Sequence, residues 1–380
     1  MSPSGRRRWW RRPRSLLAFA AALLLIVVAL MFGVGWYFSD NLLDPIHPRI
    51  AENLQVYALA DGRITLPSTA KTRTRQIWGV AWPGGYGQVF GPVSVSGSRV
   101  SRRFRILDGT LRPDMEVGLD VDAYPSDPRT AFGLAYRTVS VRSSLGVFPA
   151  WEVPGRRGTW VIFVHGRGAT RRVALRVLPT IARLGLPSLD ITYRNDLGAP
   201  RSPNGLYELG KTEWLDLQSA AQWAVNHGAR RLVLVGWSMG GAIVSQFMHS
   251  SRLAGRVVGL ILDAPVLDWN ATISLGGERA GLPGFETWIA GEIASHRIGI
   301  HFSSFDQVRR AHEFHVPILL FHGTADTTVP IGPSEAFAAA LPRLVTLVKT
   351  AGAGHVESWN VDQRRYDAAV HIFLRSLTRH

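Results

Sequence analysis

A serine between two glycines stands where an apolar run meets a helical pattern. Gly236, Ser238 and Gly240 form this Gly-x-Ser-x-Gly sequence. The branched-aliphatic residues 231–235 are typical of a buried strand, and the apolar spacing of residues 241–248 is typical of an amphipathic helix. So tight a turn strains the serine backbone and leaves little room for side chains two residues before and after it. The sequence therefore predicts Ser238 at a sharp strand-to-helix corner with a glycine on each side.

Two polar residues follow later strand-like runs. Asp326 comes after the apolar residues 316–321, and His355 lies on a glycine-rich loop after residues 344–348. A serine hydroxyl becomes nucleophilic when an imidazole accepts its proton, and a carboxylate can orient that imidazole. Ser238, His355 and Asp326 are therefore predicted to act together as nucleophile, base and acid.

The chain order Ser238, Asp326, His355 on these elements resembles the α/β-hydrolase superfamily. It is most similar to the serine-hydrolase branch that joins esterases, lipases, thioesterases and prolyl-oligopeptidase-type peptidases. The resemblance covers residues 135–380. It implies a mostly parallel eight-stranded sheet flanked by helices, with the three residues on loops at the carboxyl ends of neighbouring strands.

The same resemblance assigns an oxyanion hole. The strand-like residues 160–164 lead into the loop 165–168, which carries glycines on both sides of Arg167. In the family, one backbone N–H comes from this loop and the other from the residue after the nucleophile. These positions are Arg167 and Met239. For the Arg167 side chain, a solvated position is favoured over binding of an acidic substrate.

Other acids and histidines were weighed against these assignments. Asp263 and Asp268 follow the apolar run 257–262, where some hydrolases of this fold keep their acid, so they are alternatives to Asp326. His165 and His322 each precede a glycine and are expected to bond to backbone. The remaining loose cluster lacks the spacing of a zinc site and comprises His296, His301, His312 and His315. No metal and no cofactor are expected, and the chain has no cysteine.

An uncharged apolar segment precedes the hydrolase region. Residues 15–38 are long enough to cross a bilayer as a helix, and Trp36 and Tyr37 suit an interface. Six arginines lie in residues 1–14, whereas the first charge after the segment is Asp40. The positive-inside rule predicts a cytoplasmic N-terminus and an extracytoplasmic catalytic domain. A cleaved signal peptide is the alternative, but an uncleaved anchor is favoured, since the apolar run is longer than a typical signal core and ends in Gly33-Val34-Gly35-Trp36-Tyr37-Phe38.

The net charge of +15 does not by itself indicate a nucleic-acid partner. The arginines beside a spanning segment are better explained by membrane topology and anionic lipid. The expected partners are therefore the membrane and a small-molecule or lipid ester.

Residues 39–134 have a different character from the rest of the chain. Short, partly alternating stretches such as 76–82 and 102–107 are divided by Gly and Pro, which predicts a small β-rich region. A spacer that packs on the hydrolase is favoured over a role in selecting substrate.

Residues 267–315 form an insertion before the strand that leads to Asp326. Its apolar content resembles the lid of many hydrolases of this fold, while a fixed pair of helices covering the sheet is the alternative. If it is a lid, its apolar side chains are expected to line the acyl side of the pocket; they include Trp269, Phe285, Trp288 and Ile289.

The sequence thus predicts a membrane-anchored serine hydrolase that cleaves neutral, short to medium-chain carboxylic esters through an acyl-enzyme at Ser238. A peptidase or amidase of the prolyl-oligopeptidase type is the alternative enzyme. A non-catalytic binding protein with the same fold is the alternative from another class, but it would have no need for all three triad residues.

Overall fold

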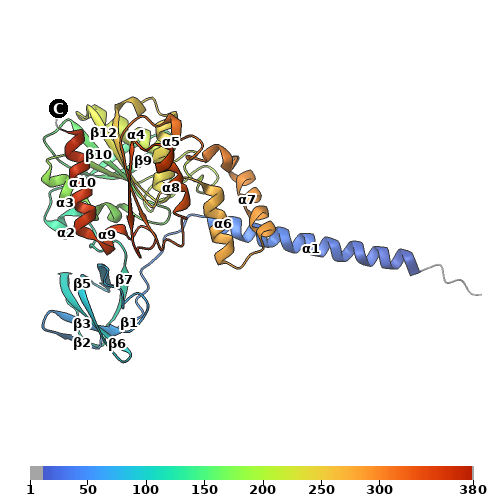
Figure 1. The fold of residues 1–380 in the computed structure, drawn as a ribbon, viewed down its shortest axis with the longest axis horizontal. Helices are drawn as coiled ribbons and strands as arrows, with labels where there is room; N and C mark the ends of the chain where they lie inside the picture. The colour runs from blue at the N-terminus through green and yellow to red at the C-terminus, as the bar shows by residue number, and fades with distance from the viewer. Residues whose placement is uncertain (1–11, 379–380) are drawn as a thin grey trace, which may run out of the picture.

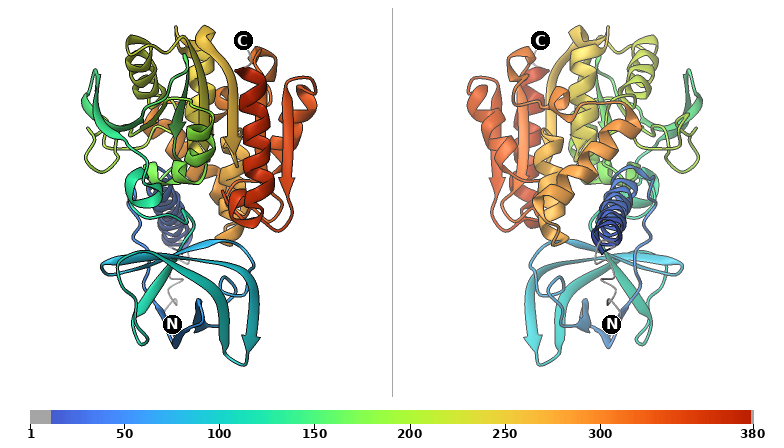
Figure 2. Two further views of the ribbon diagram at one scale, coloured as in Figure 1. Left: turned by 90° about the vertical axis from the view of Figure 1, so that its left-hand side faces the viewer. Right: turned by 90° about the vertical axis from the view of Figure 1, so that its right-hand side faces the viewer.

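The computed structural model describes residues 12–378. It contains a long N-terminal helix, a β-rich region and a larger part built on a central sheet (Figure 1). Most of the arginine-rich tail predicted at residues 1–14 lies outside the described residues. The two sheets lie at opposite ends of the body, and the N-terminal helix leaves it at an angle (Figure 2).

The N-terminal helix α1 spans Arg12–Leu43 and is longer than the predicted segment 15–38. Its portion Leu16–Leu43 contains an 18-residue window with a mean hydropathy of 2.9 and is, by length and composition, able to cross a membrane. The helix continues beyond the predicted end because its last turns pack into the larger part of the protein. Ser39 is 1% exposed and Leu43 is fully buried.

The β-rich region forms a seven-stranded antiparallel sheet in the order β1-β7-β4-β5-β6-β3-β2. Alternate side chains of its strands form a separate apolar core that includes Val80, Trp82 and Val117. The strands are β1 (Leu54–Gln55), β2 (Ala58–Ala60), β3 (Arg63–Pro67), β4 (Trp78–Trp82), β5 (Gly85–Ser96), β6 (Arg99–Asp108) and β7 (Glu116–Asp120).

The larger part contains an eight-stranded sheet in the order β15-β14-β13-β12-β10-β11-β9-β8. The pairs β8–β9 and β9–β11 are antiparallel, and the others are parallel. The central strands are buried on both faces, which explains their nearly continuous apolar sequences. The strands are β8 (Arg137–Ser143), β9 (Gly146–Val153), β10 (Thr159–Val164), β11 (Ser188–Ile191), β12 (Arg231–Trp237), β13 (Val257–Asp263), β14 (Ile318–Gly323) and β15 (Val345–Thr350).

Helices cover both faces of this sheet and form two apolar cores. One face carries α3 (Leu178–Arg183), α9 (Ser358–Val361) and α10 (Gln363–Leu377), and the other carries α4 (Trp214–Asn226), α5 (Met239–Ser250) and α8 (Gly332–Ala340). A short helix, α2 (Pro128–Phe132), connects the β-rich region to β8. Parallel strands with helices on both sides place loops at the carboxyl ends of β10, β12, β14 and β15, where the predicted site residues lie.

The segment predicted as a lid contains α6 (Trp269–Arg279) and α7 (Gly284–Ile298), followed by two short 3-10 turns. This α6–α7 hairpin lies beside the end of α1, as both views show (Figures 1 and 2). A helix that is apolar all round can use some of its surface for protein contacts, and α1 does so here.

Candidate active site

Ser238 occupies the corner between β12 and α5 with a strained backbone, at φ 53° and ψ −120°. A β-carbon on Gly240 would lie 2.1 Å from the carbonyl oxygen of Val164, and one on Gly236 would lie 2.7 Å from that of Gly240. Both distances are too short for real atoms, so the two glycines allow β10, β12 and α5 to approach each other. The geometry matches the sharp corner predicted from the sequence.

The structure brings Ser238, His355 and Asp326 together from three separate loops. The Ser238 hydroxyl lies 2.8 Å from His355 Nε2, and His355 Nδ1 lies 2.7 Å from Asp326 Oδ2. With the proton on Nδ1, the imidazole donates to the carboxylate and accepts from the serine. This is the arrangement that general-base activation of a serine requires.

Asp326 is held as an anion although its side chain is fully buried. Burial alone would raise its pKa, but hydrogen bonds from His322 and His355 outweigh burial and hold the pKa well below its usual range. The amides of Thr328 and Val329 also donate to Oδ1, at 2.8 and 2.9 Å. The carboxylate is thereby fixed in position and charge to orient His355.

His322 belongs to this arrangement, beyond the backbone contact expected of it. Its Nε2 lies 3.1 Å from the Val329 carbonyl, as predicted, but also 3.4 Å from Asp326 Oδ2. Because Nε2 faces these two acceptors, it carries the proton, and Nδ1 then accepts from the Ser334 hydroxyl at 2.8 Å. The only signal for this contact in the sequence is the four-residue spacing to Asp326.

The two alternative acids have other surroundings. Asp263 is buried at the end of β13, and burial raises its pKa to about 6. Asp268 caps α6 by accepting from the Ala271 amide at 3.2 Å. Neither carboxylate hydrogen-bonds to His355 in the part of the chain that the structure describes. Asp326 is the acid that the geometry favours.

The loop after β10 lies against the serine. A β-carbon on Gly166 would be 2.9 Å from Ser238 Cβ, so glycine permits this close approach. Met239 is the first residue of α5, where helix amides lack a partner within the helix. The backbone amides of Arg167 and Met239 are therefore the candidate donors to an oxyanion beside Ser238.

His165 and Tyr193 hold this loop from behind. The carbonyl oxygen of Gly166 accepts from Tyr193 Oη at 3.0 Å and lies 2.9 Å from His165 Nδ1. His165 Nε2 lies 2.9 Å from Asp196 Oδ2, so both ring nitrogens face acceptors and the imidazolium fits best. Burial lowers the pKa of His165, but the Asp196 carboxylate outweighs burial and raises it. The expectation of a backbone-bonded histidine is thus only part of its role.

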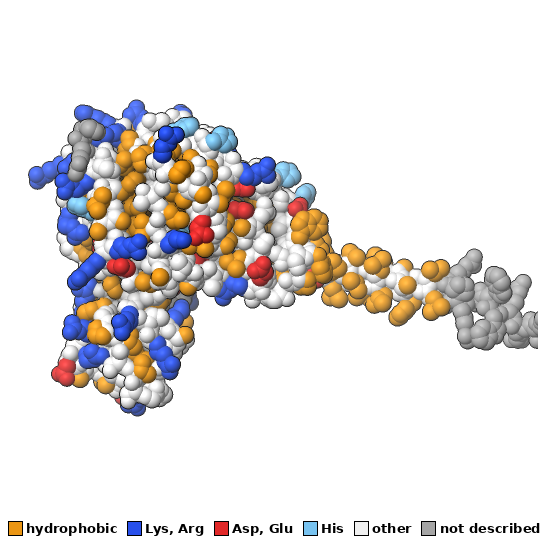
Figure 3. Space-filling view, in the orientation of Figure 1, with side chains coloured by type: hydrophobic (Ala, Val, Ile, Leu, Met, Phe, Trp, Pro, Cys, Tyr) orange, Lys and Arg blue, Asp and Glu red, His pale blue; other side chains and the backbone are white. Residues whose placement is uncertain are grey.

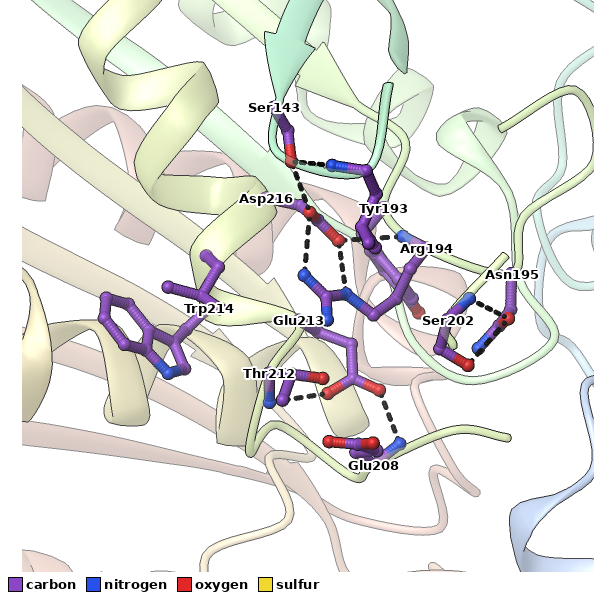
Figure 4. Close-up of polar contacts among 12 residues, drawn as sticks. Ser143, Tyr193, Arg194, Asn195, Ser202, Glu208, Thr212, Glu213, Trp214 and Asp216 are labelled. Atoms are coloured by element: carbon purple, nitrogen blue, oxygen red, sulfur yellow. Dashed lines mark hydrogen bonds and ion pairs between the residues drawn. The ribbon is translucent and has the colours of Figure 1, made fainter. Parts of the chain in front are cut away.

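Asp196 and Tyr193 were not singled out from the sequence. They follow β11, and their segment is tied to α4 by a buried ion pair in which Arg194 Nε lies 2.8 Å from Asp216 Oδ2 (Figure 4). Nearby, the Glu213 carboxylate accepts from the backbone amides of Glu208 and Gly210 at 2.7 and 2.9 Å. This turn directly precedes α4, which begins at Trp214.

The Arg167 side chain follows neither of the two expectations for it. Its Nη2 donates to the carbonyl oxygens of Asn41 and Asp44 at 2.5 and 3.2 Å, beside the last turn of α1. The amide of Tyr207 donates to the Leu43 carbonyl at 2.8 Å. Helix ends leave such carbonyls unpaired, so the larger part of the protein caps α1 with the same residue whose amide is a candidate oxyanion donor.

A cleft of about 770 Å³ separates the hydrolase from the β-rich region and includes His355 in its wall. We call it the polar cleft, because charged side chains from both regions line it. From residues 39–134 come Arg49, Lys71, Asp120 and Asp122, and from the hydrolase come Arg167, Arg172 and Glu357. The β-rich region therefore contributes directly to the surroundings of the triad.

The polar cleft contains one compact charge cluster. Asp120 accepts from Arg172 and from the Tyr86 hydroxyl, the latter at 2.6 Å. Asp122 lies 3.9 Å from Arg172, and its burial together with the charge of Asp120 raises its pKa to about 6. The cluster joins the two regions of the protein, since Arg172 belongs to the hydrolase.

A smaller cavity of about 240 Å³ lies between α1 and the α6–α7 hairpin. We call it the apolar groove; it is lined by Phe38, Asn41, Leu42, Thr272, Ile273, Gly276, Gly277, Leu282, Thr287, Ala290, Gly291 and Thr328. Thr328 follows the triad acid by two residues, and Asn41 is bonded to Arg167. The groove thus ends beside two loops of the candidate active site.

The aromatic side chains expected to line the acyl pocket do not all do so. Phe285 and Trp288 are 54% and 66% exposed, so the expectation is wrong for them. Trp269 is buried, and its Nε1 donates to the Leu209 carbonyl at 3.1 Å. Ile289 packs toward Gly35 of α1. Sequence reasoning did not foresee that α1 would pack against the inserted hairpin and use part of its apolar surface.

No group of three or more metal-ligating side chains is found within the described residues 12–378.

Comparisons with known proteins agree with the observed fold. The sequence model of the prolyl oligopeptidase family matches residues 202–379, which include Ser238, Asp326 and His355. An esterase from Pyrococcus furiosus is similar in structure with 18% identity and a TM-score of 0.54, over 67% of this chain and 95% of that chain. No curated protein sequence matches.

Two further solved structures are more distant. A thermophilic esterase from Thermogutta terrifontis has 18% identity and a TM-score of 0.45, over 64% of this chain and 99% of that chain. An alpha-beta hydrolase from Vibrio vulnificus has 21% identity and a TM-score of 0.48, over 62% and 80%. The sheet order together with the likeness to the Pyrococcus esterase confirms the predicted α/β-hydrolase fold.

Proposed function

We propose that this protein is a membrane-anchored serine hydrolase that cleaves carboxylic esters. The observation that carries the proposal is the continuous chain of hydrogen bonds from Ser238 through His355 to the buried anion of Asp326. A binding protein that only uses the fold has no need for this arrangement beside a strained serine.

The mechanism follows from the positions of these groups. The Ser238 hydroxyl attacks the ester carbonyl carbon while His355 Nε2 accepts its proton. The negative charge that develops on the carbonyl oxygen is stabilised by the amides of Arg167 and Met239, and one such donor is worth on the order of 3 kcal/mol. His355 returns the proton to the departing alcohol oxygen, which leaves an acyl group on Ser238.

Water then completes the reaction. His355 removes a proton from a water molecule, the resulting hydroxide attacks the acyl carbon, and the carboxylic acid leaves as Ser238 regains its proton. Asp326 keeps the imidazole in the tautomer with the proton on Nδ1 and stabilises the imidazolium at each transfer.

The surroundings of the triad support an ester with one polar and one apolar part. The polar cleft offers charged groups near His355, and the apolar groove offers a narrow apolar space near Thr328. A peptidase is the second candidate, because the matching family model is that of the prolyl oligopeptidases and includes all three triad residues. The same chemistry cleaves amides when the amine is the leaving group.

The anchoring of the chain by α1 is part of the proposal. Its support is the apolar length of Leu16–Leu43 together with the capping of its end by Arg167 and Tyr207. Removal of α1 as a signal peptide would take away a helix that packs against α7 and borders the apolar groove. The arginine asymmetry favours a cytoplasmic N-terminus and a catalytic domain on the other side.

A fluorophosphonate probe tests the central claim. The full-length protein should be labelled at Ser238, and Ser238→Ala and His355→Ala should lose labelling, since the alkoxide forms only with the base in place. Labelling of a folded Ser238→Ala protein would contradict the proposal. Hydrolysis of p-nitrophenyl esters beside proline- and arginine-type amides then separates the two candidates, because faster cleavage of an amide than of every ester would favour the peptidase.

A further inference from the structure

Helix α7 runs alongside α1 in the same direction. The backbone of Gly35 lies against Ile289 and Ile293, since a β-carbon there would be 2.9 Å from both side chains. One turn further along both helices, Arg297 Nη1 lies 2.7 Å from Asp40 Oδ1. The first turns of α7 therefore extend along α1 toward the part of α1 that is apolar and exposed.

The outer face of α7 changes character along its length. Phe285 and Trp288 are large, apolar and more than half exposed. Glu292 and His296, which follow on the same face at helical spacing, are exposed and polar. Glu286 stands about a quarter of a turn from Phe285, off this face, and is half-buried. The exposed face thus passes from apolar to charged between Trp288 and Glu292.

Helix α1 changes character at the same level. Its exposed side chains are apolar through Trp36 and Tyr37, and its first acid is Asp40. The contacts with Ile289 and Arg297 place this boundary beside the boundary on α7. Figure 3 shows apolar side chains along α1 that continue onto the adjoining end of the hairpin. Such a continuous apolar surface is much larger than soluble proteins usually expose.

We infer that the first two turns of α7 lie in the same lipid bilayer as α1, with Trp288 at the interface, and that the apolar groove receives the acyl chain of a lipid ester from that bilayer. A tryptophan between an apolar and a charged turn is typical of a membrane interface. The bilayer contact follows from the two helices alone. The substrate class rests on the proposed function.

The position of the apolar groove supports the inference that it receives an acyl chain from the bilayer. It is bounded by Phe38 at the apolar boundary of α1, by Leu42 just over one turn beyond it, and by Thr328 two residues after the candidate triad acid. An acyl chain that enters between α1, α6 and α7 would therefore lie in a groove whose lining reaches Thr328, on the loop of the candidate triad acid. Each methylene group that leaves water on entering the groove favours this placement.

Site-directed labelling tests the bilayer contact. Because the chain has no cysteine, the full-length variants Phe285→Cys, Trp288→Cys and Glu292→Cys each carry one nitroxide label in phosphatidylcholine vesicles. Ile372→Cys on α10 is the matched control, since Ile372 is 69% exposed. Labels at 285 and 288 should be several-fold more accessible to oxygen than to an aqueous nickel chelate, relative to the label at 372. Equal accessibility at 288 and 372 would overturn the inference.

An activity measurement tests the route of the substrate. In the same vesicles, the double variant Phe285→Ser with Trp288→Ser should cleave a vesicle-borne long-chain ester about tenfold more slowly, while its rate with p-nitrophenyl acetate in solution stays unchanged and reports the fold. An unchanged rate with the vesicle-borne ester would overturn the lipid route.

Failure of the proposed function and failure of the bilayer contact give different results. If the wild type cleaves neither ester, the proposed function and the lipid route are both wrong. The label accessibilities still decide whether α7 contacts the bilayer, because they need no activity.

Discussion

The polar cleft and the apolar groove lie beside the same triad but are built from different parts of the chain. The cleft takes charged side chains from the β-rich region, and the groove takes apolar side chains from α1 and the inserted hairpin. Only the triad loops belong to the shared fold. The candidate triad thus stands on loops of the common fold, whereas much of its surroundings comes from segments attached to or inserted into that fold.

Loss of the triad acid should cause the largest fall in activity. The fall should be the same for substrates that occupy the polar cleft and for those that occupy the apolar groove. Asp326→Asn removes control of the His355 tautomer, so kcat should fall by about 10⁴-fold for short, long and charged esters alike. Steady-state hydrolysis across such a panel measures this. Asp263→Asn is the matched control and should stay within a few-fold of wild type; the reverse pattern would show that the acid is misassigned.

The contribution of the polar cleft to folding stability should depend on pH, whereas that of the apolar groove should not. Folding raises the pKa of Asp122 from its ordinary value near 3.8 to about 6, so the folded state holds the proton more tightly than the unfolded state. Stability from this group is full below pH 4 and is lost as pH rises through 6, by up to about 3 kcal/mol.

Asp122→Asn should therefore gain stability relative to wild type between pH 4 and 7. Denaturant unfolding of the detergent-solubilised protein at pH 4, 6 and 8 measures the difference. A constant difference across this range would show that Asp122 has no raised pKa. Gly276→Ala, in the apolar groove, is the control whose stability difference should not vary with pH.

Filling the apolar groove should affect only long acyl chains. A β-carbon on Gly276 would meet no atom within 4 Å, so Gly276→Leu places a larger side chain in the space without a clash at its base. The value of kcat/KM should fall about tenfold for p-nitrophenyl dodecanoate and remain near wild type for the acetate. Gly255→Leu, at another open position, should change neither. An equal loss for both esters would mean that the groove does not hold the acyl chain.

The smallest effect is expected from the exposed cations of the polar cleft. Lys71 lines the cleft and is exposed to solvent, so its attraction for an anionic substrate group is screened by salt. Lys71→Ala should lower kcat/KM for an ester with an anionic alcohol part by about threefold at low salt and leave a neutral ester unaffected. An equal change in kcat/KM for both esters would show that Lys71 does not select anionic substrates.

The triad could be predicted from the sequence because each of its residues carries a local signal. Gly236 and Gly240 mark the corner at Ser238, and Asp326 and His355 follow short buried strands. Strand ends on parallel strands meet at one edge of a sheet, so their approach needed no further information. The observed distances of 2.8 and 2.7 Å agree with that expectation.

The supporting contacts around the triad carried weaker signals. Asp196 and Tyr193 lie after β11, and nothing in their spacing indicates that they brace the carbonyl of Gly166. The second contact of His322 with Asp326 likewise depends on how a loop folds back on its strand. Such hydrogen bonds are set by loop conformation, which local sequence patterns describe poorly.

The hydrolase fold, the candidate triad and an apolar N-terminal helix could be predicted from the amino-acid sequence, because they follow from short-range patterns of glycine, strand and helix periodicity. The surroundings of the triad emerge only in the folded protein. A helix apolar on every side does not reveal that Gly35 will pack against Ile289, and no pattern links Arg167 to the end of α1. Those contacts join residues more than a hundred positions apart, and their existence depends on the shapes of surfaces that form only when the chain has folded.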